Sequence, residues 1–134
     1  MPAGLPVGAG DTEVAMDFRK VVVWTVTIFV GAVMLLSGAS KIVQMAYWRQ
    51  QFVEAWGLPG WLAPVTGLAE IAGAALLLVP RRAVFGGGLI ALIMIGAAGT
   101  HVMAGELERV PVPVALAALA AFVAWYRCPW CGSD

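Results

Sequence analysis

Three titratable side chains lie within or beside the long apolar runs of the chain: Lys41, Glu70 and His101. An ionisable side chain in hydrocarbon costs roughly 2.5–3.5 kcal/mol on insertion scales, so it normally faces other helices and has a partner or a task. Each has a hydroxyl nearby: Ser37 and Thr66 lie four residues before Lys41 and Glu70, a spacing that puts both residues on one helix face, and Thr100 adjoins His101. We therefore predict one polar pocket that opens outward, lined by Ser37, Ser40, Lys41, Thr66, Glu70, Thr100 and His101.

Glu70, His101 and Lys41 are the candidate catalytic residues of this pocket. A buried carboxyl and an imidazole can relay protons, and Lys41 would supply positive charge and pair with Glu70. Each residue also has a structural interpretation. Lys41 would extend to the headgroups, Glu70 would bond a hydroxyl or carbonyl, and His101 would make an ordinary polar contact. One histidine cannot supply both axial ligands of a haem, so a bis-histidine haem within one chain is excluded.

The second candidate site is the pair Cys128 and Cys131, which are candidate redox thiols. Two cysteines at this spacing can form a reversible disulfide, and the motif can lower a thiol pKa. Cys128, however, follows a predicted helix C-terminus, whose partial negative charge opposes a thiolate. A structural zinc site needs four ligands, so a single pair would require a partner. A reducing cytoplasm also disfavours a structural disulfide. We expect an inert tail in preference to a redox or metal site.

The composition indicates an integral membrane protein. The chain has 134 residues, 61% hydrophobic and 12% charged, with a mean hydropathy of +0.88. The charged fraction is about half the globular norm of roughly 25%. Four apolar runs predict an all-α four-helix bundle, with spans at about 21–43, 61–79, 83–104 and 112–126. The net charge is zero and no run of Lys or Arg exceeds two residues, so the chain has no electrostatic footprint for nucleic acid.

Three segments make up the predicted domain organisation: a flexible cytoplasmic tail at 1–19, a membrane domain at 20–127 and a cytoplasmic tail at 128–134. Residues 11–13 could cap a short helix. The sequence Ser37-Gly38-Ala39 is typical of a signal-peptide cleavage site. An acidic leader and an apolar run of 16 residues at 21–36 favour a retained span instead.

The segment 44–56 differs from the spans because it is amphipathic. Met45, Trp48, Phe52 and Trp56 recur at helical spacing, with most of the polar residues elsewhere. We predict a helix that lies in the interface with its tryptophans at headgroup level.

The basic residues predict an orientation. Five fall on one side of the predicted topology, namely Arg19, Lys20, Arg81, Arg82 and Arg127, and three on the other, namely Lys41, Arg49 and Arg109. By the positive-inside rule, both termini are cytoplasmic.

Over about residues 20–127, the chain resembles the DoxX-like family of small bacterial membrane proteins. The resemblance depends on Ser37-Gly38-Ala39-Ser40-Lys41, on Phe52 with Gly57-Leu58-Pro59, and on Gly67-Leu68-Ala69-Glu70-Ile71-Ala72-Gly73 followed by Leu76-Leu77-Leu78. It implies a four-helix bundle in the bacterial inner membrane. Family members include the membrane part of a thiosulfate:quinone oxidoreductase, a relative linked to methylamine-dehydrogenase maturation, and eukaryotic cargo receptors and assembly chaperones. The terminal CPWC lies outside the shared region.

Two functional hypotheses follow. The first is a redox-associated subunit of a quinone- or sulfur-compound-linked oxidoreductase, whose pocket takes a quinone headgroup or a small sulfur anion. The chain has no haem, flavin or iron–sulfur motif, so a partner would supply the electrons. The second is a non-catalytic scaffold or assembly factor within a homo-oligomer or a hetero-complex, where Lys41–Glu70 fixes helix orientation. A permease is disfavoured because the chain lacks paired broken helices and repeat symmetry.

Overall fold

The computed structural model describes residues 9–131, with side chains from residue 17 onward, and it is helical with no strand in that range. The elements in chain order are α1 (Ala9–Val43), α2 (Met45–Gln50), the π-helix η1 (Gln51–Ala55), α3 (Leu62–Leu78), the 3-10 turn η2 (Pro80–Arg82), α4 (Ala83–Met103), the 3-10 turn η3 (Leu107–Arg109) and α5 (Pro111–Tyr126). The predicted all-α bundle is confirmed.

The first helix is longer than the sequence pattern predicts. It begins at Ala9, so residues 9–19 of the predicted flexible tail are helical, and only 1–8 of that tail lie outside the described residues. At 1.5 Å per residue its 35 residues span about 50 Å. That exceeds a hydrocarbon core of about 30 Å, so the first turns extend beyond the membrane.

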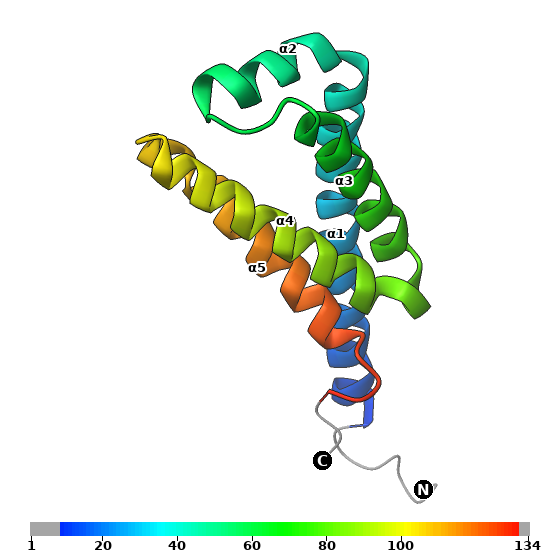
Figure 1. Ribbon diagram of the computed structural model, residues 1–134. Coiled ribbons are helices and arrows are strands. Elements are labelled where there is room, and N and C mark those ends of the chain that lie inside the picture. Colours follow the sequence, from blue (N-terminus) through cyan, green and yellow to red (C-terminus); the bar gives the residue numbers. More distant parts are fainter. Residues whose placement is uncertain (1–8, 132–134) are drawn as a thin grey trace, which may run out of the picture.

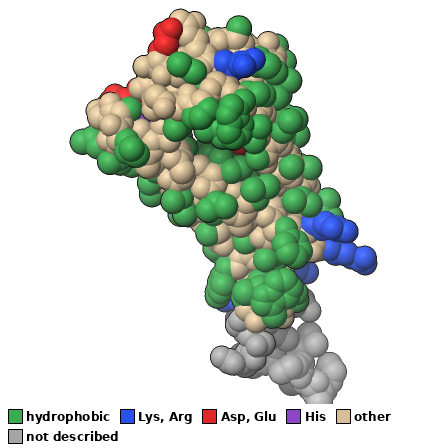
Figure 2. Space-filling view, in the orientation of Figure 1, with side chains coloured by type: hydrophobic (Ala, Val, Ile, Leu, Met, Phe, Trp, Pro, Cys, Tyr) green, Lys and Arg blue, Asp and Glu red, His purple; other side chains and the backbone are tan. Residues whose placement is uncertain are grey.

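Three segments are long and apolar enough to cross a membrane: 17–43, 80–103 and 107–126. The helix α3 is shorter, with 17 residues or about 25 Å, but it connects the two ends of the bundle (Figure 1). Large apolar side chains point outward along all four helices, among them Phe29, Leu36, Leu68, Leu92 and Phe122. Figure 2 shows this apolar surface between charged side chains near the two ends of the molecule. The chain is therefore a membrane protein.

The bundle consists of two helix pairs that diverge toward one end. The helices α1 and α3 pack together, α4 and α5 pack together, and α3 also packs on α4. In Figure 1 the pair α4–α5 leans away from α1 below α2. Where the pairs meet, the core is fully buried and closely packed, with Val30, Leu77, Ile90, Ala120 and Val123 each 0% exposed.

Close contact between α1 and α3 depends on two glycines. A Cβ atom on Gly38 would lie 2.5 Å from the Gly67 carbonyl oxygen, and a Cβ on Gly67 would lie 2.8 Å from the Lys41 Cβ. Real Cβ atoms do not approach other atoms so closely. The two backbones can therefore touch here only because both residues are glycine, and this crossing lies beside Lys41 and Glu70.

The amphipathic segment is helical as predicted, but its apolar face is directed inward. It forms α2 and η1, and the left-handed Gly57 (φ +66°) follows it. Trp48, Phe52 and Trp56 line a pocket inside the bundle, because the diverging helix pairs leave an apolar space beneath this segment that its aromatic side chains close. The headgroup depth expected for the two tryptophans stays a prediction.

Candidate functional site

An ion pair joins α1 to α3 in the interior of the bundle. The Lys41 ammonium donates to both carboxylate oxygens of Glu70, at 3.2 and 3.3 Å. The Glu70 side chain is 2% exposed and that of Lys41 is 9% exposed. The Gly38–Gly67 crossing brings the two backbones close enough for this bond. Opposite charges therefore neutralise one another in a place where either one alone would be costly.

Two further groups hold the Lys41 ammonium. It donates to the Ser37 hydroxyl at 2.9 Å, one helical turn earlier. It also lies 4.6 Å from the centroid of the Trp48 ring, which is within cation–π range. The carboxylate, the hydroxyl and the indole thus fix the ammonium within the bundle, and Lys41 does not extend to the surface.

The ion pair lines a pocket of about 750 Å³. Residues of all four long helices line it, together with α2, η1 and η3. Most lining side chains are apolar, for example Met34, Phe52, Ile93 and Leu116. Figure 2 shows the surface hollowed in its upper part, between the arm that carries α2 and the arm of α4 and α5. This combination of an apolar cavity and a few polar groups is typical of small-molecule sites.

Six of the seven predicted pocket residues line this cavity: Ser37, Lys41, Thr66, Glu70, Thr100 and His101. The Thr100 hydroxyl donates to the Gly96 carbonyl within its own helix. Ser40 does not line the pocket, which corrects that prediction. Its hydroxyl accepts a bond of 3.0 Å from the Trp48 indole N–H, so Ser40 positions a lining residue.

His101 lines the same pocket but pairs with a residue that the sequence analysis did not select. Its Nδ1 lies 2.7 Å from Glu106 Oε2. The Trp56 indole N–H donates to this same oxygen at 3.2 Å, and the Trp56 and His101 rings meet edge to face at 5.6 Å. The three predicted catalytic residues thus share one cavity in two groups, Lys41 with Glu70 and His101 with Glu106.

The carboxyl of Glu106 is held in its ionised form. The hydrogen bond from His101 lowers its pKa below the ordinary value, with further lowering by the Trp56 N–H and the Arg109 charge, while partial burial opposes them. An ionised carboxylate only accepts hydrogen bonds, so the bonded Nδ1 of His101 must be the donor. Nε2 is then the ring nitrogen left for a ligand or a proton.

Sequence reasoning missed Glu106, and it did not assign Trp48 and Trp56 to the pocket. Glu106 follows a turn at Gly105 (φ +77°), which folds the chain back toward His101 five residues earlier. A glycine between a histidine at a helix end and a nearby acid is the signal that could have indicated it. The tryptophans were identified, but as interfacial residues, because the period of a helix does not say which side its apolar face packs on.

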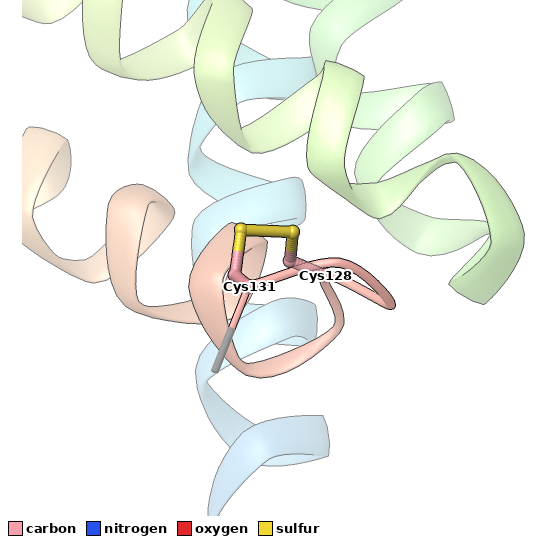
Figure 3. The surroundings of a disulfide bond; sticks show 2 residues. All are labelled: Cys128 and Cys131. Carbon is pink, nitrogen blue, oxygen red and sulfur yellow. A yellow bond between two sulfur atoms is a disulfide. The ribbon is translucent and has the colours of Figure 1, made fainter. Parts of the chain in front are cut away.

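The cysteines lie at the opposite end of the molecule from the pocket. Cys128 and Cys131 are joined by a disulfide, shown in Figure 3. The disulfide was not expected, because the sequence analysis disfavoured a structural disulfide at this position. That expectation used only the compartment and the helix dipole, whereas the turn after α5 brings the two Cα atoms within 5.2 Å, well inside disulfide range. Residues 132–134 of the predicted tail lie outside the described residues.

Among the side chains of residues 17–131, no group of three or more His, Cys, Asp or Glu could hold a metal ion.

The model of the DoxX-like family matches the chain over residues 25–123. The match includes both helix pairs, Lys41, Glu70 and His101, and it ends before the cysteines. No curated protein and no solved structure matches the chain. Because the match covers well over half of the sequence, the chain belongs to the DoxX-like family.

Proposed function

Taking the chain as a member of the DoxX-like family, we propose that it is a quinone-binding subunit of a membrane oxidoreductase. The observation that carries this proposal is the apolar pocket with the Lys41–Glu70 pair in its wall. Its volume of about 750 Å³ lies within the usual range of about 300–1,000 Å³ for small-molecule sites. A quinone has a neutral polar ring and an apolar tail, which matches this lining.

The charge balance favours a quinone over a sulfur oxyanion. Glu70 already neutralises the Lys41 ammonium, so the pair presents a dipole and no net positive charge. An anion would enter an apolar cavity without a counter-charge, at a high desolvation cost. A neutral carbonyl carries no such cost, and it can accept from the Ser37 or Thr66 hydroxyl.

His101 would transfer protons to or from the bound ring. Reduction of a quinone to a quinol takes up two electrons and two protons. Because Glu106 fixes Nδ1 as the donor toward itself, Nε2 of His101 is the group that would exchange a proton with a ring oxygen. The electrons would come from a partner protein that carries a flavin, haem or iron–sulfur centre. We place the chain in the bacterial inner membrane with both termini in the cytoplasm, following its basic residues.

A titration of the protein in nanodiscs with decylubiquinone tests this function. Quinone rings quench indole fluorescence, and Trp48 and Trp56 line the pocket. We expect saturable quenching at one quinone per chain, which Ala69→Phe abolishes by filling the cavity. Ala72→Phe is the matched control, because Ala72 lies on the exposed face of the same helix. Quenching that never saturates, or that is equal in both variants, would refute the proposal.

A scaffold role has one specific observation in its favour. On α4, a Cβ added to Gly88 or Gly99 would meet nothing within 4 Å, and both residues are exposed. They lie 11 residues apart and therefore on nearly the same helix face, where another helix could approach closely. Cysteine cross-linking in native membranes from Gly88→Cys would detect such a contact. Without a cross-linked partner, the scaffold role has no support.

A further inference from the structure

The disulfide at the end of α5 is accessible from one side only. Cys128 is 7% exposed, and its backbone N–H donates to the Trp125 carbonyl oxygen in the last turn of the chain's final helix. Cys131 is exposed, and so is its neighbour in the sequence, Trp130, at 63%. A nucleophile from solution therefore reaches the disulfide through Cys131, and Cys128 is the shielded leaving group.

A positively charged residue, Arg127, precedes the shielded cysteine in the sequence. The guanidinium of Arg127 lies 4.6 Å from the centroid of the Trp24 ring on α1. Its Nε is buried and has no hydrogen-bond partner among the described residues. A neighbouring cation stabilises a thiolate, and a full charge outweighs the partial negative charge of about one half at a helix C-terminus. The residue before Cys128 thus favours its departure as a thiolate.

The exposed indole indicates the class of partner. Trp130 precedes Cys131 in the chain and exposes a large apolar surface, which can pack against a protein that approaches Cys131. A small thiol such as glutathione would gain little from this surface. In a reducing compartment, disulfides are usually transient and exchange with protein dithiols.

We propose that Cys128–Cys131 is a thiol–disulfide exchange site that accepts two electrons from a protein dithiol of the thioredoxin class. A thiolate of the partner attacks Sγ of Cys131, the Cys128–Cys131 bond breaks, and a mixed disulfide forms between the partner and Cys131. Cys128 leaves as a thiolate and takes up a proton. The second thiolate of the partner then attacks the partner's own sulfur, and Cys131 leaves and is protonated. The partner loses two electrons and two protons, and the pair gains them. This exchange does not depend on ligand binding in the pocket.

Trapping with a thioredoxin that lacks its second active-site cysteine tests the proposal. The full-length protein in nanodiscs is first oxidised with diamide. We expect a mixed disulfide that mass spectrometry maps to Cys131, and reduction by intact thioredoxin at least tenfold faster than by glutathione at equal thiol concentration. An adduct at Cys128, equal rates with glutathione, or failure of the two cysteines to pair would each overturn it.

Two substitutions separate recognition from chemistry. Trp130→Ala should slow reduction by thioredoxin several-fold and leave reduction by glutathione unchanged. Arg127→Met should slow both reactions, because a leaving thiol of higher pKa leaves more slowly, and Arg127→Lys should restore them. An Arg127→Met variant with unchanged rates would show that the guanidinium does not stabilise the leaving thiolate.

Discussion

The Lys41–Glu70 pair is tolerated in the interior because its two charges cancel. Both side chains are nearly inaccessible to solvent, so the cost of removing their charges from water is offset only while both are present. The Lys41 ammonium also donates a hydrogen bond to the Ser37 hydroxyl and makes a cation–π contact with the Trp48 ring. The pair therefore fixes how α1 and α3 are oriented, and it leaves the pocket wall polar but uncharged overall.

A double-mutant cycle tests this coupling. Lys41→Met and Glu70→Met each leave one buried charge without its partner, and each should lower the free energy of unfolding by about 3 kcal/mol or more. The double variant should lose much less than the sum of the two, because no lone charge remains. Unfolding by SDS in mixed micelles provides the measurement. Additive losses would show that the two side chains are not coupled.

Because the pKa of the Glu106 carboxyl is lowered in the folded protein, we expect Glu106 to stabilise the fold less as the pH falls. Its pKa in the folded protein is lowered, mainly by the bond from His101, from an ordinary value of 4.5. A lowered pKa stabilises the fold above the unfolded value, and that contribution is lost as the pH falls through the folded pKa. We expect Glu106→Gln to melt below the wild type at pH 7 and level with it at the acid end of a series from pH 7 to 3. A constant difference across the series would contradict this account.

At the scale of the helices, the backbone contact between α1 and α3 is the feature on which the ion pair depends. The glycines at this crossing set the separation of the two helices. Small residues at helix contacts were expected from the sequence, and Gly86 and Gly87 on α4 likewise meet neighbouring backbone. Gly88, Gly96 and Gly99 do not. The spacing of the glycines in the sequence does not show which of them face a neighbouring helix and which face outward.

Substitution of a glycine at this crossing should lower the thermal stability of the protein while leaving the side chains of the ion pair unchanged. Gly38→Ala or Gly67→Ala forces the backbones apart and should lower the thermal midpoint by several degrees, because neither carbonyl can move as a flexible side chain would. Gly99→Ala is the matched control, since a Cβ there meets open space, and it should leave the midpoint unchanged or raise it. Thermal unfolding in one detergent compares the three. Equal midpoints in all of them would mean that the crossing tolerates a methyl group.

For the molecule as a whole, hydropathy was sufficient to predict four helices, and their bounds agree within a few residues except at the start of α1. The pairing of Lys41 with Glu70 also followed, because depth in the membrane and helix periodicity limit which charges can meet. The inward apolar face of α2 and η1 did not follow, since that depends on how far α4 and α5 diverge from α1. Glu106 was missed because the Gly105 turn, and no helical repeat, brings it to His101.

The arrangement of the whole molecule separates two kinds of chemistry. The pocket lies at the end that carries α2, while the disulfide follows Arg127, which contacts Trp24 in the N-terminal half of α1, toward the opposite end (Figure 1). Quinone binding and thiol exchange would therefore take place on different sides of the membrane domain, and each can be removed by substitution without touching residues of the other.

The central claim is that a neutral quinone occupies the cavity between the two helix pairs. Photolabelling of the protein in membranes with an azidobenzoquinone, followed by peptide mapping, tests it most directly. The account predicts labels on pocket-lining segments of both pairs, around Glu70 on α3 and around His101 on α4, and competition by excess decylubiquinone but not by thiosulfate. Labels confined to outward-facing residues such as Leu68 and Leu92, with no competition by the quinone, would contradict it.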